Sequence, residues 1–164
     1  MPTGRMTAQV DEPFVVFVIG MRINRYRAVH RWLPVFLAMP RMLRELEADP
    51  EAGLLGYETL FDRRTVVTIQ YWESFDDVRR YARDADREHV PAWVAYDESA
   101  GDGALGVFHE TYVVDPEDCE SVYRDLPAFG LGAAGGLEPA TGPRETAGQR
   151  LGVVEDDGLV VDER

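Results

Sequence analysis

The sequence has no lysine, a single cysteine, three histidines and no long hydrophobic run. Its 17 basic residues are all arginine and face 30 acidic residues, which gives a formal net charge of −13 at pH 7. So acidic a protein repels the phosphates of nucleic acids and the headgroups of anionic membranes, so we expect neither as a partner. The single cysteine, Cys119, excludes an internal disulfide and a cysteine-cluster metal site.

The longest apolar run, Phe14 to Met21, has eight residues, whereas a membrane helix needs about 20. No apolar stretch follows a basic start in the manner of a secretory signal peptide. We therefore expect a cytoplasmic protein. The 164 residues, 45% of them hydrophobic, suit one globular domain with a tail.

Runs of β-branched and aromatic residues alternate with segments of helical periodicity. Strands are predicted at residues 14–23, 54–61, 65–72 and 105–114. Helices are predicted over residues 30–48 and from Ser74 through His89, with Pro40 kinking or splitting the first and Pro91 stopping or bending the second. The order β-α-β-β-α-β predicts an α+β, ferredoxin-like fold, in which both helices cover one face of an antiparallel sheet.

We expect residues 1–13 to be a flexible N-terminus, 14–132 the folded domain and 133–164 an acidic, loosely ordered C-terminal tail. The first strand is apolar throughout, so both faces of the sheet should be covered. A homodimer that packs sheet against sheet is the natural cover for the second face. Phe17 or Ile19 is then expected to contact the partner subunit.

Two histidines are candidates for chemistry. On a second helix continued past residue 85, His89 falls on the apolar face, where it could act as a base or as a ligand. The alternative is a purely structural histidine in the core, hydrogen-bonded to a backbone carbonyl. His109 and Glu110 point to opposite faces of the last strand, so one of them is semi-buried on either arrangement. Arg22 is a candidate partner for Glu110, and a structural pair at the dimer seam is the simpler interpretation of it.

Six arginines and no acid lie between residues 22 and 44. This local field, with Arg25 and Arg31 in it, suits a substrate carboxylate or a haem propionate, although solvated arginines paired with distant acids explain it as well. The large rings of the chain could wall an apolar pocket between helices and sheet, or simply fill the core. They are Trp32, Phe36, Trp72, Tyr81, Trp93, Tyr96 and Phe108.

Several familiar motifs are missing from the sequence. It has no glycine-rich dinucleotide or phosphate loop, no nucleophile elbow and no zinc-ligand spacing. The acids around Cys119 should raise the pKa of its thiol, which makes it a poor nucleophile.

Five segments of the chain resemble one family of oxygenases. They are IGMRINRYRAVHRWLPVFLAMPRMLREL (19–46), YWESFDDVRRYARD (71–84), HVPAW (89–93), GVFHETYVV (106–114) and LPAFGLG (126–132). Together they resemble monooxygenases similar to the fumagillin-pathway multifunctional oxygenase. That group lies within the dimeric α/β-barrel superfamily, beside antibiotic-biosynthesis monooxygenases, haem-degrading oxygenases, chlorite dismutases and aldoxime dehydratases.

The resemblance implies a homodimer with one pocket in each subunit, between its own helices and sheet. In haem-binding cousins, a histidine near the end of the second helix holds the iron, and His89 lies in a comparable place. In cofactor-free cousins, Asn, Trp and His side chains hold the substrate beside O2, and Asn24, Trp93 and His89 match them by residue type.

We therefore expect an oxygenase that acts on a small apolar organic molecule with O2. His89 would be the base or, if haem b binds, the axial ligand, with Arg25 and Arg31 toward the haem. His109 and Arg22 would supply polar contacts. A haem-dependent lyase of the aldoxime-dehydratase type and a non-catalytic dimer that binds a small molecule are the rival hypotheses. The pocket walls would be Asn24, Trp32, Phe36, Trp72, Trp93 and Tyr96.

Overall fold

The computed structural model describes residues 3–99 and 103–153. They divide into two compact units. Residues 15–113 form the larger unit, and the two ends of the chain, up to Phe14 and from Val114, form the smaller one.

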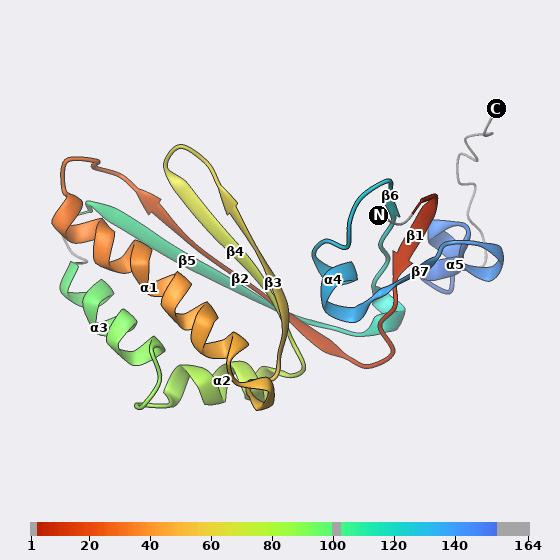
Figure 1. Cartoon of the computed structure of the whole chain (residues 1–164), viewed down its shortest axis with the longest axis horizontal. Coiled ribbons are helices and arrows are strands. Elements are labelled where there is room, and N and C mark those ends of the chain that lie inside the picture. The colour runs from red at the N-terminus through yellow and green to blue at the C-terminus, as the bar shows by residue number, and fades with distance from the viewer. Residues whose placement is uncertain (1–2, 100–102, 154–164) are drawn as a thin grey trace. The chain divides into compact units, whose positions relative to one another are not determined.

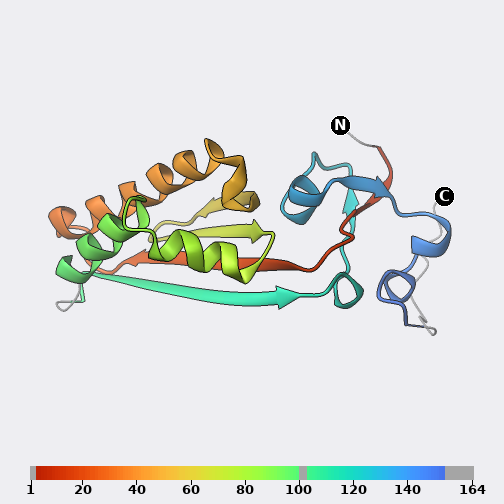
Figure 2. The same ribbon diagram turned by 90° about the horizontal axis from the view of Figure 1, so that it is seen from below.

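A four-stranded sheet is the base of the larger unit (Figure 1). Its strands are β2 (Phe14–Ile23), β3 (Leu54–Phe61), β4 (Thr65–Trp72) and β5 (Leu105–Val114), in the order β3-β4-β2-β5. β2 and β3 both run antiparallel to β4, and β5 runs opposite to β2 (Figure 2). The strands begin and end where the sequence predicts, and the ferredoxin-like α+β fold is confirmed.

The two faces of this sheet follow from its register. Opposite Gln70 and Thr68 of β4, Phe17 and Ile19 of β2 point to the face that the helices cover, where both line a cavity. Val18 stands opposite Ile69 and takes the other face. The prediction that Phe17 or Ile19 contacts a partner subunit is therefore wrong, because the strand alternation places them inside the subunit.

One long helix, α1 (Val29–Glu47), crosses the sheet and buries Ala38, Met42, Leu43 and Leu46. Pro34 and Pro40 both lie inside it, and it continues through both as one element. The expected split at Pro40 does not occur. Pro40 is exposed, so water can satisfy the carbonyl that loses its helical donor.

The second helical segment is broken in two. α2 (Phe75–Arg83) begins at Ser74, whose hydroxyl accepts from the backbone N–H of Asp77 at 3.2 Å, and α3 (His89–Ser99) follows after five residues. The predicted continuous helix from Ser74 to His89 is wrong. Asp84 leaves the helical conformation, and its carboxylate accepts from the backbone N–H of Asp86 at 3.0 Å. The helices lie together on one side of the sheet (Figure 2).

The smaller unit joins both ends of the chain. Its sheet has the order β6-β1-β7, formed by β1 (Arg5–Ala8), β6 (Tyr123–Arg124) and β7 (Leu137–Pro139). The expected flexible start and loose tail are therefore wrong for the residues in these elements, while residues 154–164 lie outside the described part. Short helices complete both units: η1 (Pro50–Ala52), η2 (Pro116–Asp118), α4 (Leu131–Gly135), η3 (Gly142–Arg144) and α5 (Ala147–Arg150).

No helix in the described ranges is both long and apolar enough to cross a membrane.

Candidate functional site: an apolar cavity beneath three helices

A cavity of about 570 Å³ lies between the sheet and the three helices of the larger unit. That volume lies within the range of small-molecule sites. Its floor comes from alternate residues of β2, β4 and β5, and its roof from α1, α2 and α3. The walls are mainly apolar, and include Phe17, Ile19, Met21, Val35, Phe36, Met39, Met42, Val66, Phe75, Val78, Val90, Trp93 and Val107.

His89, the first residue of α3, lines this cavity. Its Nδ1 atom is buried and has no hydrogen-bond partner among the described residues. Burial lowers the pKa of the imidazole below its ordinary value of 6.5, and a hydrogen bond with the backbone of Ala82 opposes this shift. The ring is therefore neutral at neutral pH. Features of both interpretations of the sequence are present, because His89 lies in the pocket and is also hydrogen-bonded to a backbone group.

Glu45 of α1 holds the start of α3 in place. One oxygen of its carboxylate, Oε2, accepts from the hydroxyl of Tyr81 at 2.8 Å and from the backbone N–H of Glu88 at 3.1 Å. Burial and the Glu45 carboxylate raise the pKa of Tyr81, so its hydroxyl remains a donor. The Tyr81 ring meets the His89 ring edge-on, with 6.2 Å between centroids. These contacts fix the position of the imidazole.

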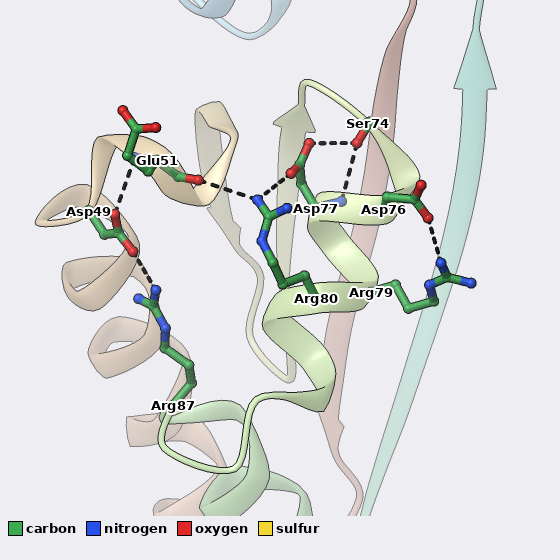
Figure 3. Close-up of polar contacts among 8 residues, drawn as sticks. All are labelled: Asp49, Glu51, Ser74, Asp76, Asp77, Arg79, Arg80 and Arg87. Carbon is green, nitrogen blue, oxygen red and sulfur yellow. Dashed lines mark hydrogen bonds and ion pairs between the residues drawn. The ribbon is translucent and has the colours of Figure 1, made fainter.

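Ion pairs fix the break between α2 and α3 (Figure 3). Arg87 pairs with Asp49 at the end of α1, and its Nε lies 3.5 Å from the Asp84 carboxylate. The hydrogen bond from Arg87 holds the pKa of Asp49 below its usual range. The sequence pattern does not reveal this break, because it depends on a contact between residues 38 positions apart.

His109 of β5 lines the same cavity from the floor. Its ring lies against Phe17, with 5.6 Å between centroids and 34° between planes. Unlike His89, its side chain is exposed. Glu110 faces the other way and accepts from the hydroxyl of Tyr112 at 2.6 Å, so the expected pairing of Glu110 with Arg22 is not what the structure shows.

The predicted pocket rings divide into two groups. Phe36, Trp93 and Tyr96 line the cavity. Trp72 does not, because it is packed into the core at 1% exposure and donates its indole N–H to Gln70 at 3.0 Å. Trp32 also lies outside the lining; its indole N–H donates to the carbonyl of Tyr26 at 3.1 Å, and its ring touches that of Phe36 edge-on.

Four polar residues predicted for the site lie outside the cavity lining. Arg22 is exposed on β2, and its guanidinium lies 3.4 Å from the hydroxyl of Thr65. Asn24 and Arg25 are exposed in the loop after β2, and the backbone N–H groups of both donate to Ala104. Arg31 lies in the first turn of α1. Strand alternation and the start of α1 direct these side chains away from the cavity.

Two arginines that sequence reasoning missed line the cavity, Arg79 and Arg83 of α2. Charged residues on an amphipathic helix usually face solvent, so neither is conspicuous in the sequence. The two are spaced four residues apart on one face of the helix, and that spacing is the signal that could have identified them.

The residues predicted to hold haem do not come together in this cavity. A haem iron needs a ring nitrogen that faces open space, whereas Nδ1 of His89 is enclosed and the same ring hydrogen-bonds the Ala82 backbone. Arg25 and Arg31, expected beside the haem, are not among the residues that line the cavity. In the described residues, no group of three or more His, Cys, Asp or Glu side chains could hold a metal ion.

A family model described as monooxygenase af470-like matches residues 14–131. Among solved structures, SnoaB, a cofactor-independent oxygenase from Streptomyces nogalater, is similar with a TM-score of 0.45 and 17% identity, over 62% of this chain and 93% of that chain. A dimeric protein of unknown function and ferredoxin-like fold from Bacteroides fragilis also has a TM-score of 0.45 and 17% identity, over 62% and 96%. No curated protein matches.

Proposed function

Since the chain belongs to the monooxygenase af470-like family, we propose that it is a monooxygenase that inserts oxygen from O2 into a small, largely apolar organic molecule held in the cavity beneath α1, α2 and α3. The proposed functional type is that of the fumagillin-pathway oxygenase group, which its motifs resemble. The observation that carries the proposal is the cavity itself: an apolar hollow of about 570 Å³ with the neutral imidazole of His89 in its wall.

His89 is the proposed base. A neutral imidazole with an unpaired nitrogen can accept a proton from an electron-rich C–H group of the substrate. Since Nδ1 is enclosed, neighbouring side chains must shift when substrate binds, as catalytic contacts often tighten only in the complex. Apolar walls favour the reaction by excluding water from the resulting carbanion.

The reaction balances without an added reductant. The substrate carbanion gives one electron to O2, and the two radicals combine to form a C–O bond in a peroxide. The peroxide O–O bond then breaks, one oxygen stays on carbon as a carbonyl, and the other leaves as water with the proton that His89 returns and a second substrate proton. A CH2 group is thus oxidised to C=O, and O2 supplies both the product oxygen and the water.

Oxygen uptake by purified protein tests this proposal. The protein is given a panel of quinols and conjugated polyenes under ¹⁸O2, and the product is analysed by mass spectrometry. We expect one ¹⁸O atom per product. His89→Ala should lower the rate by about 10²- to 10⁴-fold, whereas His30→Ala, an exposed histidine in the first turn of α1, should leave it unchanged.

A non-catalytic binding protein is the second candidate function. The hydrogen bond between His89 and the Ala82 backbone favours this second function, since a histidine whose hydrogen bond is made in this way can have a purely structural role in the core. No oxygen uptake with any member of the panel, combined with ligand binding in the cavity, would replace the first proposal with this one.

A second copy of the chain is the proposed cover of the outer sheet face. That face carries Val18 and Ile69 in the centre, and Leu60, Phe108 and Tyr112 at 48%, 41% and 50% exposure. Ile69→Asp should weaken the dimer in analytical ultracentrifugation, since an unpaired charge cannot remain in such a seam. Glu58→Asp on β3, which keeps the charge, is the control. An Ile69→Asp dimer as stable as the wild type would contradict sheet-on-sheet packing.

A further inference from the structure

The cavity and the whole protein have opposite charge. In a chain with a formal charge of −13, no Asp or Glu is among the described residues that line the cavity. Its basic lining groups are Arg79 and Arg83 together with His89 and His109, and Tyr96 adds a neutral phenol. An apolar cavity with this lining attracts a ligand that is itself apolar and negatively charged.

We propose that the ligand of this cavity is an amphipathic carboxylate, whose apolar body fills the hollow while its carboxylate pairs with Arg83. This inference rests on the proposed function, because it names the substrate class of the same site.

Arg83 differs from Arg79 in having no competing partner. Arg79 donates to the carboxylate of Asp76 at 2.7 Å (Figure 3). Among the described residues, no carboxylate or carbonyl forms a hydrogen bond or ion pair with Arg83. A guanidinium offers a fork of N–H donors that a carboxylate can accept in pairs. Arg83 therefore has its full capacity available to a ligand.

The position of Arg83 suits the charged end of a ligand, because this end need not be buried there. Its side chain is exposed although the residue lines the cavity, so it stands where the cavity meets solvent. A carboxylate placed there keeps part of its hydration and avoids the large cost of burying a charge. The apolar walls further inside then receive the hydrocarbon part, and a bare anion would gain nothing from them.

Two fluorescent probes test the inference, cis-parinaric acid and its methyl ester, whose polyene emission rises in apolar surroundings. Binding to the full chain is titrated at low salt. We expect the acid to bind about five- to ten-fold more tightly than the ester, the range of a charge-assisted pair at a partly exposed site. Raising the salt concentration should shrink this preference, since exposed charges are screened.

Three variants assign the effect. Arg83→Gln should remove the preference for the acid and leave ester binding unchanged, and Arg83→Lys should keep part of the preference. The matched control is Arg44→Gln, which removes the same charge from an exposed residue of α1 outside the cavity lining and should change neither affinity.

Each result decides the matter. Equal affinities of acid and ester in the wild type, or equal losses of both in Arg83→Gln, would overturn the anionic ligand and leave the proposed oxygenase standing. Failure of both probes to bind would overturn the apolar site itself, and the proposed function with it.

Discussion

The two units of this chain each contain a cavity of about 570 Å³, yet the two cavities differ in chemistry. The one in residues 15–113 has apolar walls, and two of its lining groups, Nδ1 of His89 and the Arg83 guanidinium, have no partner among the described residues. The one in the smaller unit has a mixed polar and apolar lining, and its Arg150 already donates to the Glu120 carboxylate and to the carbonyls of Arg144 and Glu145.

The difference shows that volume alone does not identify a ligand site. In the second cavity the Arg150 guanidinium is partnered, and burial together with Glu120 raises the pKa of the Cys119 thiol, so that thiol is a weak nucleophile. In the first cavity, groups that could contact a ligand are left without partners.

Arg150→Gln should destabilise the smaller unit by about 2 kcal/mol, because the side chain is only 5% exposed and its removal takes the guanidinium donor from the Glu120 carboxylate and the Arg144 carbonyl. Native-state hydrogen exchange of the β1 amides measures the loss. Binding of cis-parinaric acid should stay unchanged. A variant that weakened this binding would mean that the second cavity takes part in ligand recognition.

Val35 lies on α1 in the cavity wall, so the larger side chain of Val35→Trp should fill the apolar cavity. The affinity for cis-parinaric acid should fall at least ten-fold, which is about 1.4 kcal/mol. Leu151→Trp places the same ring in the second cavity and should not change the affinity. Both are measured by the same fluorescence titration. The reverse pattern would assign the ligand to the smaller unit.

A smaller effect should be seen with pH. Since the pKa of His89 is lowered in the folded state, the unfolded chain binds more protons as the pH falls below about 6.5. Stability is therefore fully present above pH 6.5 and is lost as the pH falls toward the folded pKa. The free energy of unfolding is measured by urea denaturation at several pH values, for the wild type and for His89→Gln. Within that window, the slope of this free energy against pH should differ between the two proteins. Identical slopes would show that His89 is not desolvated.

Arg22→Gln should have the smallest effect. Since the side chain is exposed and lies outside the cavity lining, stability should change by less than about 0.5 kcal/mol, and probe affinity should not change. The same two assays check it. A marked loss of binding would restore the role that the sequence suggested for this residue.

Local pattern was sufficient to predict the sheet of the larger unit. The four strands have the predicted bounds, because β-branched runs between turn residues are a local signal. The break at residues 84–88 was not predictable in the same way, since it is fixed by Arg87 and the distant Asp49. His89 lines the helix-covered cavity at the start of α3, whereas the sequence pattern assigned it to a continued second helix.

The smaller unit was not predicted because its pairings are remote in the sequence. Arg5 of β1 pairs with Arg124 of β6, and Met6 of β1 pairs with Pro139 of β7. None of these three short strands has an apolar pattern of its own. Some residues predicted for the site do not line the cavity, and the reason is different. Residue type pointed to Arg22 and Trp72, but strand register and core packing decide which side chains reach the cavity.

A crystal structure of the protein grown with cis-parinaric acid tests the central claim, that the cavity beneath α1, α2 and α3 is the ligand site. We predict density for the polyene between the helices and the sheet, with its carboxylate beside Arg83. Density in the cavity of the smaller unit, or an apolar cavity left empty by a ligand bound elsewhere, would contradict the claim.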